Sequence, residues 1–345
     1  MHTQSAVPSD LARLGETCAK MGSPFFGALL GYAAHAYETD SVLRDLLERH
    51  AHRSRPGLRL GGAAHFRALR GLAPEIAHHY PSTAGDGDSH AAWQAILRDM
   101  HAYAPEYDTL FAREVQTNEV ARAMPVLAAM LAVADQTHLP LRIFEIGSSA
   151  GLVLNFDRYF HSANGWSWGA QRSPVRLTNR ITSGVPGHLD ADLRLAERHG
   201  CDLHPLNAAD RNDADTLLGF VWPDQHDRFE RLRAALAVAR EHPLGIATAD
   251  GITWARTAAL PADGAVTVLL HTVMVEHLTA AQAARLHETV QTLAARARPH
   301  APFAWVRMEI AARSYETAVT LWPGAHETLI ARSDGHANNL RWTGA

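Results

Sequence analysis

The stretch Leu141–Asp157, which reads LRIFEIGSSAGLVLNFD, constrains the fold more than any other part of the chain. It begins with an apolar run short enough to be a buried strand and continues through two glycines into a helical pattern. Gly147 lets the backbone turn sharply, and Gly151 lets the start of the helix pack closely on the strand. A strand that passes directly into a helix in this way is typical of a parallel sheet covered by helices.

Strand and helix patterns alternate from this stretch to the end of the chain. The expected helices are Gly151–Phe160, Asp213–Phe220, Arg228–Glu241 and Ala280–Ala297. The expected strands are Arg142–Ile146, Cys201–His204, Leu244–Ala249, Val266–Leu270, Phe303–Ile310, Glu316–Leu321, and then Thr328–Ala331 or Leu340–Trp342. We therefore predict an α/β fold with a Rossmann-like, mostly parallel sheet and an antiparallel hairpin at its C-terminal edge.

The first 138 residues have apolar positions three and four apart and contain no strand pattern. The expected helices are Leu11–Met21, Phe26–Ala34, Ser41–Arg49, Gly61–Tyr80, His90–Tyr103 and Tyr107–Ala134. Pro125 should kink or restart the last of these helices. We predict two domains: an all-helical N-terminal lid or cap over residues 1–138, and a Rossmann-like domain over residues 139–345 with an insertion at about 161–200.

The residues of the glycine turn indicate which kind of ligand it holds. From Glu145 to Gly151 the spacing is E-x-G-x-x-x-G, with Ser149 in place of the middle glycine of a dinucleotide-binding loop and no lysine of a phosphate-binding loop. A ligand without phosphates fits this pattern better, and an acidic strand end suits the cationic amino group and sulfonium of S-adenosylmethionine. We predict that Glu145, Gly147, Ser149 and Gly151 bind this cofactor; a turn that serves packing alone has the same pattern.

Polar residues also follow the later strands, at the end of a parallel sheet where ligands bind. Asp202 ends the second expected strand and is placed to accept hydrogen bonds from ribose hydroxyls, and Asp250, followed by Gly251, ends the third and is placed to meet an adenine amino group. His271 follows the fourth strand and is our candidate catalytic base, because imidazole ionises near neutral pH. Each aspartate has an alternative role as a helix cap, and the histidine an alternative structural role.

This order of residues resembles the class I S-adenosylmethionine-dependent methyltransferases over about Leu141–Trp342. The resemblance implies that Glu145, Gly147, Gly151, Asp202 and Asp250 contact the cofactor and that His271 faces the substrate.

A closer resemblance, covering nearly the whole chain, is to an uncharacterised bacterial family known only as a domain of unknown function and regarded as methyltransferase-like. It rests on the segments QTNEVARAMPVLAAM from Gln116, EIGSSAGLVLNFDRY from Glu145, FVWPDQHDRFERLRAAL from Phe220, LLHTVMVEHL from Leu269 and LWPGAHETLIARSDGH from Leu321. The family carries no assigned substrate.

Two features depart from the class I methyltransferase pattern. The stretch 161–200 is much longer than the usual connection to the second strand, so it is either an insertion over the pocket or it contains the true second strand at Val175–Arg180. In the second case Asp202 would be misassigned. Ser149, in place of the common glycine, narrows the room for the methionine part of the cofactor.

The polar run Gln116–Glu119 interrupts an otherwise amphipathic pattern in the helical region. It is either a solvated helix face or the part of the lid that presents Gln116, Asn118 or Glu119 to the cofactor or substrate. We favour Asn118, because its amide both donates and accepts hydrogen bonds.

The overall composition excludes several other partners. The net charge of −4 gives no basic surface for nucleic acid, and no apolar run is long enough to span a membrane. The 22 histidines are scattered without a metal-binding spacing, so we expect no metal. The absence of a leader pattern and the two isolated cysteines predict a cytoplasmic protein. The sequence gives no indication of the oligomeric state.

We therefore expect S-adenosylmethionine-dependent methyl transfer to a small-molecule acceptor. The first alternative is a non-catalytic protein that binds the cofactor or acts as a scaffold on a degenerate methyltransferase fold. The second alternative is a nicotinamide-dependent oxidoreductase, against which the missing dinucleotide-binding glycine pattern argues.

Overall fold

The computed structural model describes residues 7–178 and 181–343, and the chain divides into two compact units. The first unit comprises Met1–Thr117 and Asp210–Arg233, and the second comprises Asn118–Ala209 and Ala234–Ala345. Each unit is described by itself below. Within the described ranges, no helix combines the length and the apolar character that a membrane crossing requires.

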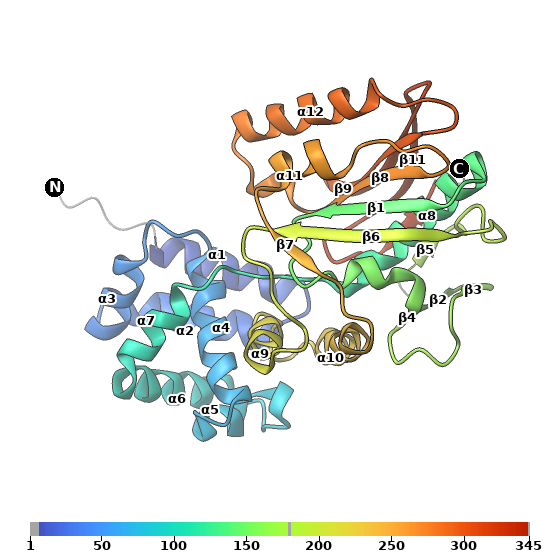
Figure 1. The fold of residues 1–345 in the computed structure, drawn as a ribbon. Coiled ribbons are helices and arrows are strands. Elements are labelled where there is room, and N and C mark those ends of the chain that lie inside the picture. Colours follow the sequence, from blue (N-terminus) through green and yellow to red (C-terminus); the bar gives the residue numbers. More distant parts are fainter. Residues whose placement is uncertain (1–6, 179–180, 344–345) are drawn as a thin grey trace. The chain divides into compact units, whose positions relative to one another are not determined.

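The first unit contains helices and no strands among its described residues (Figure 1). Its helices are α1 (Val7–Lys20), α2 (Pro24–Ala36), α3 (Ser41–Arg49), α4 (Pro56–Leu69), α5 (Pro74–His79), η1 (Pro81–Thr83), α6 (Ser89–Ala102), α7 (Ala104–Phe111), α9 (Arg211–Gly219) and the start of α10 (His226–Glu241). Aspartate caps begin α3 and α6, where Asp40 and Asp88 accept backbone N–H groups that lack an intrahelical partner.

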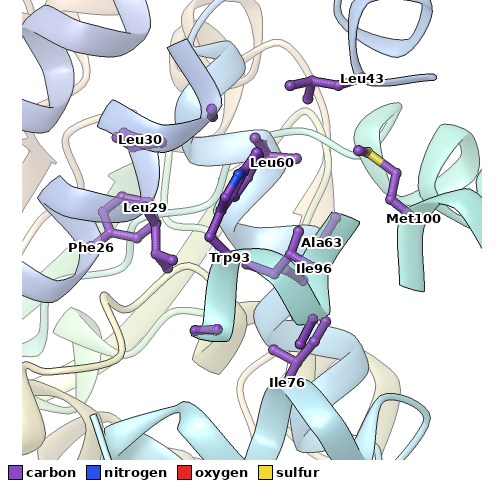
Figure 2. Packing of buried hydrophobic residues seen from close by; sticks show 14 of the residues in the cluster. Phe26, Leu29, Leu30, Leu43, Leu60, Ala63, Ile76, Trp93, Ile96 and Met100 are labelled. Carbon is purple, nitrogen blue, oxygen red and sulfur yellow. The ribbon is translucent and has the colours of Figure 1, made fainter. Parts of the chain in front are cut away.

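The core of the first unit is formed by large apolar side chains from several helices. Figure 2 shows this cluster, including Phe26, Leu29, Leu60, Ile76 and Trp93. Each is at most 3 % exposed, and burying an apolar side chain of this size contributes about 1.5–3 kcal/mol to folding. The core therefore arises from the three-and-four spacing that the sequence displays.

Two expected helices of the N-terminal region are interrupted in the structure. Gly61–Tyr80 contains the end of α4 and all of α5, because Gly71 adopts a left-handed φ of +69° and Pro74 begins a new helix. Tyr107–Ala134 contains the end of α7, η2 (Val120–Arg122) and most of α8 (Ala123–Thr137). Pro125 is the third residue of α8, where the backbone has no intrahelical N–H bond to lose, so it lies in the first turn of a newly started helix.

The second unit is built around a nine-stranded, mostly parallel sheet with the order β5-β12-β11-β10-β9-β8-β1-β6-β7 (Figure 1). Its strands are β1 (Leu141–Ile146), β5 (Ile181–Ser183), β6 (Leu195–Asp202), β7 (Ile246–Thr248), β8 (Val266–Thr272), β9 (Phe303–Ala311), β10 (Ser314–Trp322), β11 (His326–Ser333) and β12 (Leu340–Trp342). The five strands from β9 to β7 pair in parallel. This arrangement confirms the expected α/β class with a mostly parallel sheet.

Helices pack on the sheet according to the alternation of its side chains. Phe144, Leu269 and Phe303 point to the face that α11 (Gly251–Ala258) and α12 (Ala280–Ala294) cover, and they form one apolar cluster with those helices. The buried helix α8 packs against η3 (Val153–Arg158) and against β9, β10 and β11. The strands are nearly continuous apolar runs because both sides of the sheet are covered.

Two sequence predictions about the second unit need correction. The expected helix Gly151–Phe160 is only the 3₁₀ helix η3, interrupted by non-helical angles at Asn155. Arg176–Thr178 forms β4 of a separate three-stranded sheet, ordered β3 (Trp166–Trp168), β2 (Phe160–Ala163) and β4, so it is not the second strand of the main sheet. The last two residues of the predicted strand Val175–Arg180 lie outside the described residues.

The predicted C-terminal hairpin exists but is not at the edge of the sheet. It is formed by β10 and β11, the second of which contains Thr328–Ala331. β12 and β5 extend the sheet beyond it. Short strands of three residues carry too weak a pattern to be recognised, and pairing with distant segments determines their place.

Candidate functional site

The strand order places a topological switch point beside β1. The chain runs outward from β1 to β6 and β7 on one side and to β8 and β9 on the other. Connections that leave in opposite directions open a crevice at the carboxyl ends of the strands, where α/β sheets bind ligands. The residues that follow β1 and β8 are therefore the first to consider.

The turn after β1 has an unusual backbone conformation. Gly147, Ser149 and Gly151 all have left-handed φ angles, of +69°, +53° and +68°. The two glycines are required for a second reason: an added Cβ would lie 2.8 Å from Met274 Cγ at position 147 and 2.8 Å from Ile246 Cδ1 at position 151. The turn is thus fixed by the backbone and by close packing on both sides.

The end of β6 holds this turn in place. The Ser149 N–H donates to Asp202 Oδ2 over 2.8 Å, and the Ser148 N–H donates to the Cys201 carbonyl over 3.0 Å. Asp202 Oδ1 accepts from the His204 N–H over 2.9 Å. Both carboxylate oxygens of Asp202, the predicted ribose acid, therefore already accept a backbone hydrogen bond; a carboxylate oxygen has room for a second.

Glu145 is the most unusual residue near the turn. Its side chain is buried, with the residue 2 % exposed, and Oε2 has no hydrogen-bond partner among the described residues. Burial, together with the nearby Asp202 and in part offset by Arg122, raises the pKa of Glu145 to about 8. An acid held at this cost near the carboxyl end of a strand is a candidate binding group.

Arg122 is the last residue of η2 and was not among the predicted site residues, yet its charge acts on Glu145. Its Nε donates to the Gly335 carbonyl over 3.0 Å and a terminal nitrogen reaches the Thr272 carbonyl at 3.4 Å. Its charge acts on Glu145 and also lowers the pKa of Tyr315, which burial and Glu276 raise. Arg122 therefore links the electrostatics of Glu145 to the loop after β8.

The predicted base His271 is buried, and both of its ring nitrogens are engaged. Nδ1 lies 2.6 Å from Glu309 Oε1, and Nε2 accepts from the Trp305 indole N–H over 2.9 Å. Because indole nitrogen only donates, the imidazole proton lies on Nδ1 and points to Glu309. In this arrangement, His271 has no nitrogen available to a substrate; its catalytic role stays a prediction.

Glu309 organises the loop after β8 as well. Its carboxylate accepts the N–H groups of Met274 and Val275 over 3.0 and 3.2 Å. Val273 has a φ of +53°, which is strained for a β-branched residue. This loop presents Met274 to Gly147, so Glu309 acts on the turn after β1 through the loop.

The remaining predicted residues have varied surroundings. Asp250 caps α11 by accepting the N–H and hydroxyl of Thr253, which lowers its pKa, and Gly251 packs on β1 as the first residue of α11.

Asn118 has a buried amide nitrogen without a described partner, and Glu119 caps η2. Gln116 belongs to the first unit. Residues 116–119 precede η2 in non-helical backbone, so the expectation that they interrupt a helix is wrong.

A pocket of about 420 Å³ lies beside the glycine turn, within the second unit. It is lined by Ala150, Asn155, residues 205–209, Ala239 and residues 243–246. Asn155 is 1 % exposed, and neither atom of its amide has a hydrogen-bond partner among the described residues. Of the predicted cofactor residues none lines this pocket, although Ala150 belongs to the same turn.

Residues 9–342 match the model of a protein family described as "Uncharacterized protein conserved in bacteria (DUF2332)". No curated protein and no solved structure matches the chain.

Proposed function

The chain belongs to this uncharacterised bacterial family, DUF2332. We propose that it binds S-adenosylmethionine at the carboxyl ends of β1, β6 and β8 and transfers its methyl group to a small-molecule acceptor. One observation carries this proposal. Glu145, the penultimate residue of β1 at the switch point, has a buried oxygen with no described partner, and a cationic ligand would supply one.

The charge of the ligand follows from the energetics of Glu145. A buried carboxyl with a pKa of about 8 is mostly protonated at pH 7, because ionisation in the interior is costly. A ligand cation close to the carboxyl favours the ionised form and forms a charge-assisted hydrogen bond. S-adenosylmethionine carries such a cation in its amino group, and it has no phosphate that would be repelled by Glu145.

Methyl transfer places few chemical demands on the protein. A lone pair of the acceptor forms a bond to the methyl carbon as the bond from carbon to sulfur breaks, and S-adenosylhomocysteine leaves with the electron pair. The protein aligns the two reactants and excludes water. The rigid turn from Gly147 to Gly151, held by Asp202 and packed on Met274, supports such alignment.

A non-catalytic cofactor-binding protein is the second candidate, and the surroundings of His271 favour it. With Nδ1 directed to Glu309 and Nε2 accepting from Trp305, the predicted base is engaged in structural hydrogen bonds. A protein that binds the cofactor without turnover would need no base at all.

Calorimetry with S-adenosylmethionine and S-adenosylhomocysteine tests the proposal. We expect both to bind the wild type, and the Glu145→Gln variant to bind at least about tenfold more weakly, since a hydrogen bond to a charged group is worth about 1.5–3 kcal/mol. The matched control is Glu288→Gln, an exposed glutamate on α12. The absence of binding to the wild type, or equal binding by Glu145→Gln, would overturn the proposal.

Turnover distinguishes the two candidates. Incubation with S-adenosylmethionine labelled in the methyl group and a bacterial small-molecule extract should yield labelled acceptor if the protein is a methyltransferase. Binding that is accompanied by no label transfer above the level of Glu145→Gln would favour the non-catalytic protein.

A further inference from the structure

Two adjacent histidines and an aspartate converge in the first unit, far along the chain from the predicted site. His78 and His79 are the last two residues of α5, and Asp86 lies in the loop that follows η1. His79 Nδ1 lies 2.9 Å from Asp86 Oδ1, and His78 Nε2 lies 3.9 Å from Asp86 Oδ2. One ligand atom from each of the three residues lies within 4.8 Å of the others.

The backbone brings these side chains together independently of any ion. The Asp86 N–H donates to the His78 carbonyl over 3.0 Å, and the Gly87 N–H donates to the His79 carbonyl over 3.2 Å. The loop folds this tightly because residue 85 is glycine: an added Cβ would lie 2.6 Å from the His78 carbonyl oxygen. The three side chains therefore do not have to be assembled by the ion, which lowers the entropic cost of binding.

We propose that His78, His79 and Asp86 form a binding site for a divalent transition-metal ion such as Zn²⁺ or Co²⁺. Two imidazole nitrogens and one carboxylate oxygen are a ligand set that these ions take, with bonds of about 2.0–2.1 Å. Ligand atoms at the corners of a tetrahedron of that size are about 3.3 Å apart. Asp86 Oδ2 lies 3.1 Å from His79 Nδ1 and 3.9 Å from His78 Nε2, so these two separations are close to the one that the ion requires.

The surroundings determine the character of the site. The Asp88 N–H donates to Asp86 Oδ1 over 3.0 Å and so helps to hold the carboxylate in place. The His78 side chain is 74 % exposed, so a fourth coordination position is open to water. An ion at this position would tie the end of α5 to the following loop and stabilise the helical unit in proportion to its concentration.

The test is titration of the full, untagged chain with Zn²⁺ followed by calorimetry, and with Co²⁺ followed by its visible absorption. We expect one high-affinity ion per chain, Co²⁺ absorption of tetrahedral intensity, and a rise in melting temperature. His79→Ala and Asp86→Asn should each lower the affinity at least about tenfold, because each removes or neutralises one of three ligands.

The matched control is His101→Ala. His101 also pairs with an aspartate, its Nε2 lying 2.7 Å from Asp40 Oδ2, but it has no third ligand in the metal-ligand groups found among the described residues. Its loss should leave the affinity unchanged. Circular dichroism of the metal-free variants verifies folding, and Asp86→Asn retains an oxygen that can accept the Asp88 N–H.

Either of two results would overturn the site. One is the absence of saturable binding to the wild type. The other is an adventitious ion only, seen as binding that His79→Ala and Asp86→Asn leave unchanged. Because the site lies in the first unit, neither result bears on cofactor binding at Glu145.

Discussion

Glu145 and His271 point to opposite faces of the parallel sheet. Glu145 pairs in register with Leu270, and successive residues of a strand alternate between faces, so the next residue, His271, lies on the other side. His271 shares its face with Trp305 and Glu309, whereas Glu145 lies within the electrostatic influence of Asp202 and Arg122. Two residues that the sequence assigns to one crevice thus have different surroundings. We therefore expect substitutions near His271 and substitutions of Glu145 to affect stability differently.

Replacement of Glu309 should destabilise the second unit. Glu309→Ala removes the acceptor of the His271 Nδ1–H and of the Met274 and Val275 N–H groups, and a buried donor left unpaired costs about 1–3 kcal/mol. We expect the free energy of unfolding, measured with urea, to fall by about 2–4 kcal/mol. The control Glu316→Ala removes a partly exposed pair with Arg332 and should cost less than about 1 kcal/mol. Equal losses in the two variants would contradict the structural role of Glu309.

Replacement of Glu145 should have the reverse effect on stability. Between pH 4.5 and about 8 the unfolded carboxyl is ionised while the folded one retains its proton, so unfolding releases a proton and stability falls as the pH rises. The fall is about 1.4 kcal/mol per pH unit for one such group. We expect Glu145→Gln to become progressively more stable than the wild type over this range. If the free energy of unfolding in urea depends on pH in the same way in the two proteins, a raised pKa of Glu145 is excluded.

The first unit should be sensitive to acid because of His65. This histidine donates from Nδ1 to the Val221 carbonyl and accepts the Ser82 hydroxyl at Nε2, and burial lowers its pKa to about 4. Its contribution to stability is complete above pH 6.5 and is lost as the pH falls towards 4, by about 1.4 kcal/mol per unit. We expect the urea midpoint of His65→Gln to depend less on pH between 7 and 4.5 than that of the wild type. The exposed His300→Gln should retain the wild-type dependence.

Replacement of Gly147 should impair both stability and cofactor binding. The backbone of residue 147 is in the left-handed region, which costs roughly 1–2 kcal/mol for a residue with a Cβ such as alanine. In Gly147→Ala the new methyl group would also lie only 2.8 Å from Met274 Cγ. Gly264→Ala is the matched control, because residue 264 has a φ of +79° and open space around an added Cβ. We expect similar backbone costs in the two variants and weakened calorimetric binding of S-adenosylhomocysteine only in Gly147→Ala. Unchanged binding in both variants would show that the turn is not part of the ligand site.

Local patterns in the sequence predict most elements of this fold. The apolar run Arg142–Ile146 corresponds to β1, and the expected strand at Cys201–His204 overlaps the end of β6, which confirms Asp202 at a strand end beside the turn. The short strand β12, the break at Asn155 and the assignment of Asp210–Arg233 to the first unit depend on distant contacts that local periodicity does not contain.

The candidate site could be predicted only in part. The glycine turn and Glu145 follow from residue types and spacing, but the burial of Glu145 without a partner follows from packing. Glu309 accepts from the loop after β8 and Arg122 donates to Thr272 at the end of β8, both from distant positions in the chain, so no spacing indicates them. The adjacent pair His78-His79 was visible in the sequence, yet its aspartate is brought back by a folded loop rather than by helical spacing.

The central claim is that a cationic ligand ionises Glu145, and proton release on binding tests it most directly. Calorimetric titration of the wild type with S-adenosylmethionine at pH 7, repeated in buffers of different ionisation enthalpy, gives the number of protons exchanged. With a pKa of about 8, Glu145 should release close to one proton when the ligand binds, and Glu145→Gln should release about one fewer. Absence of binding to the wild type, or the same proton count in both proteins, would contradict the account.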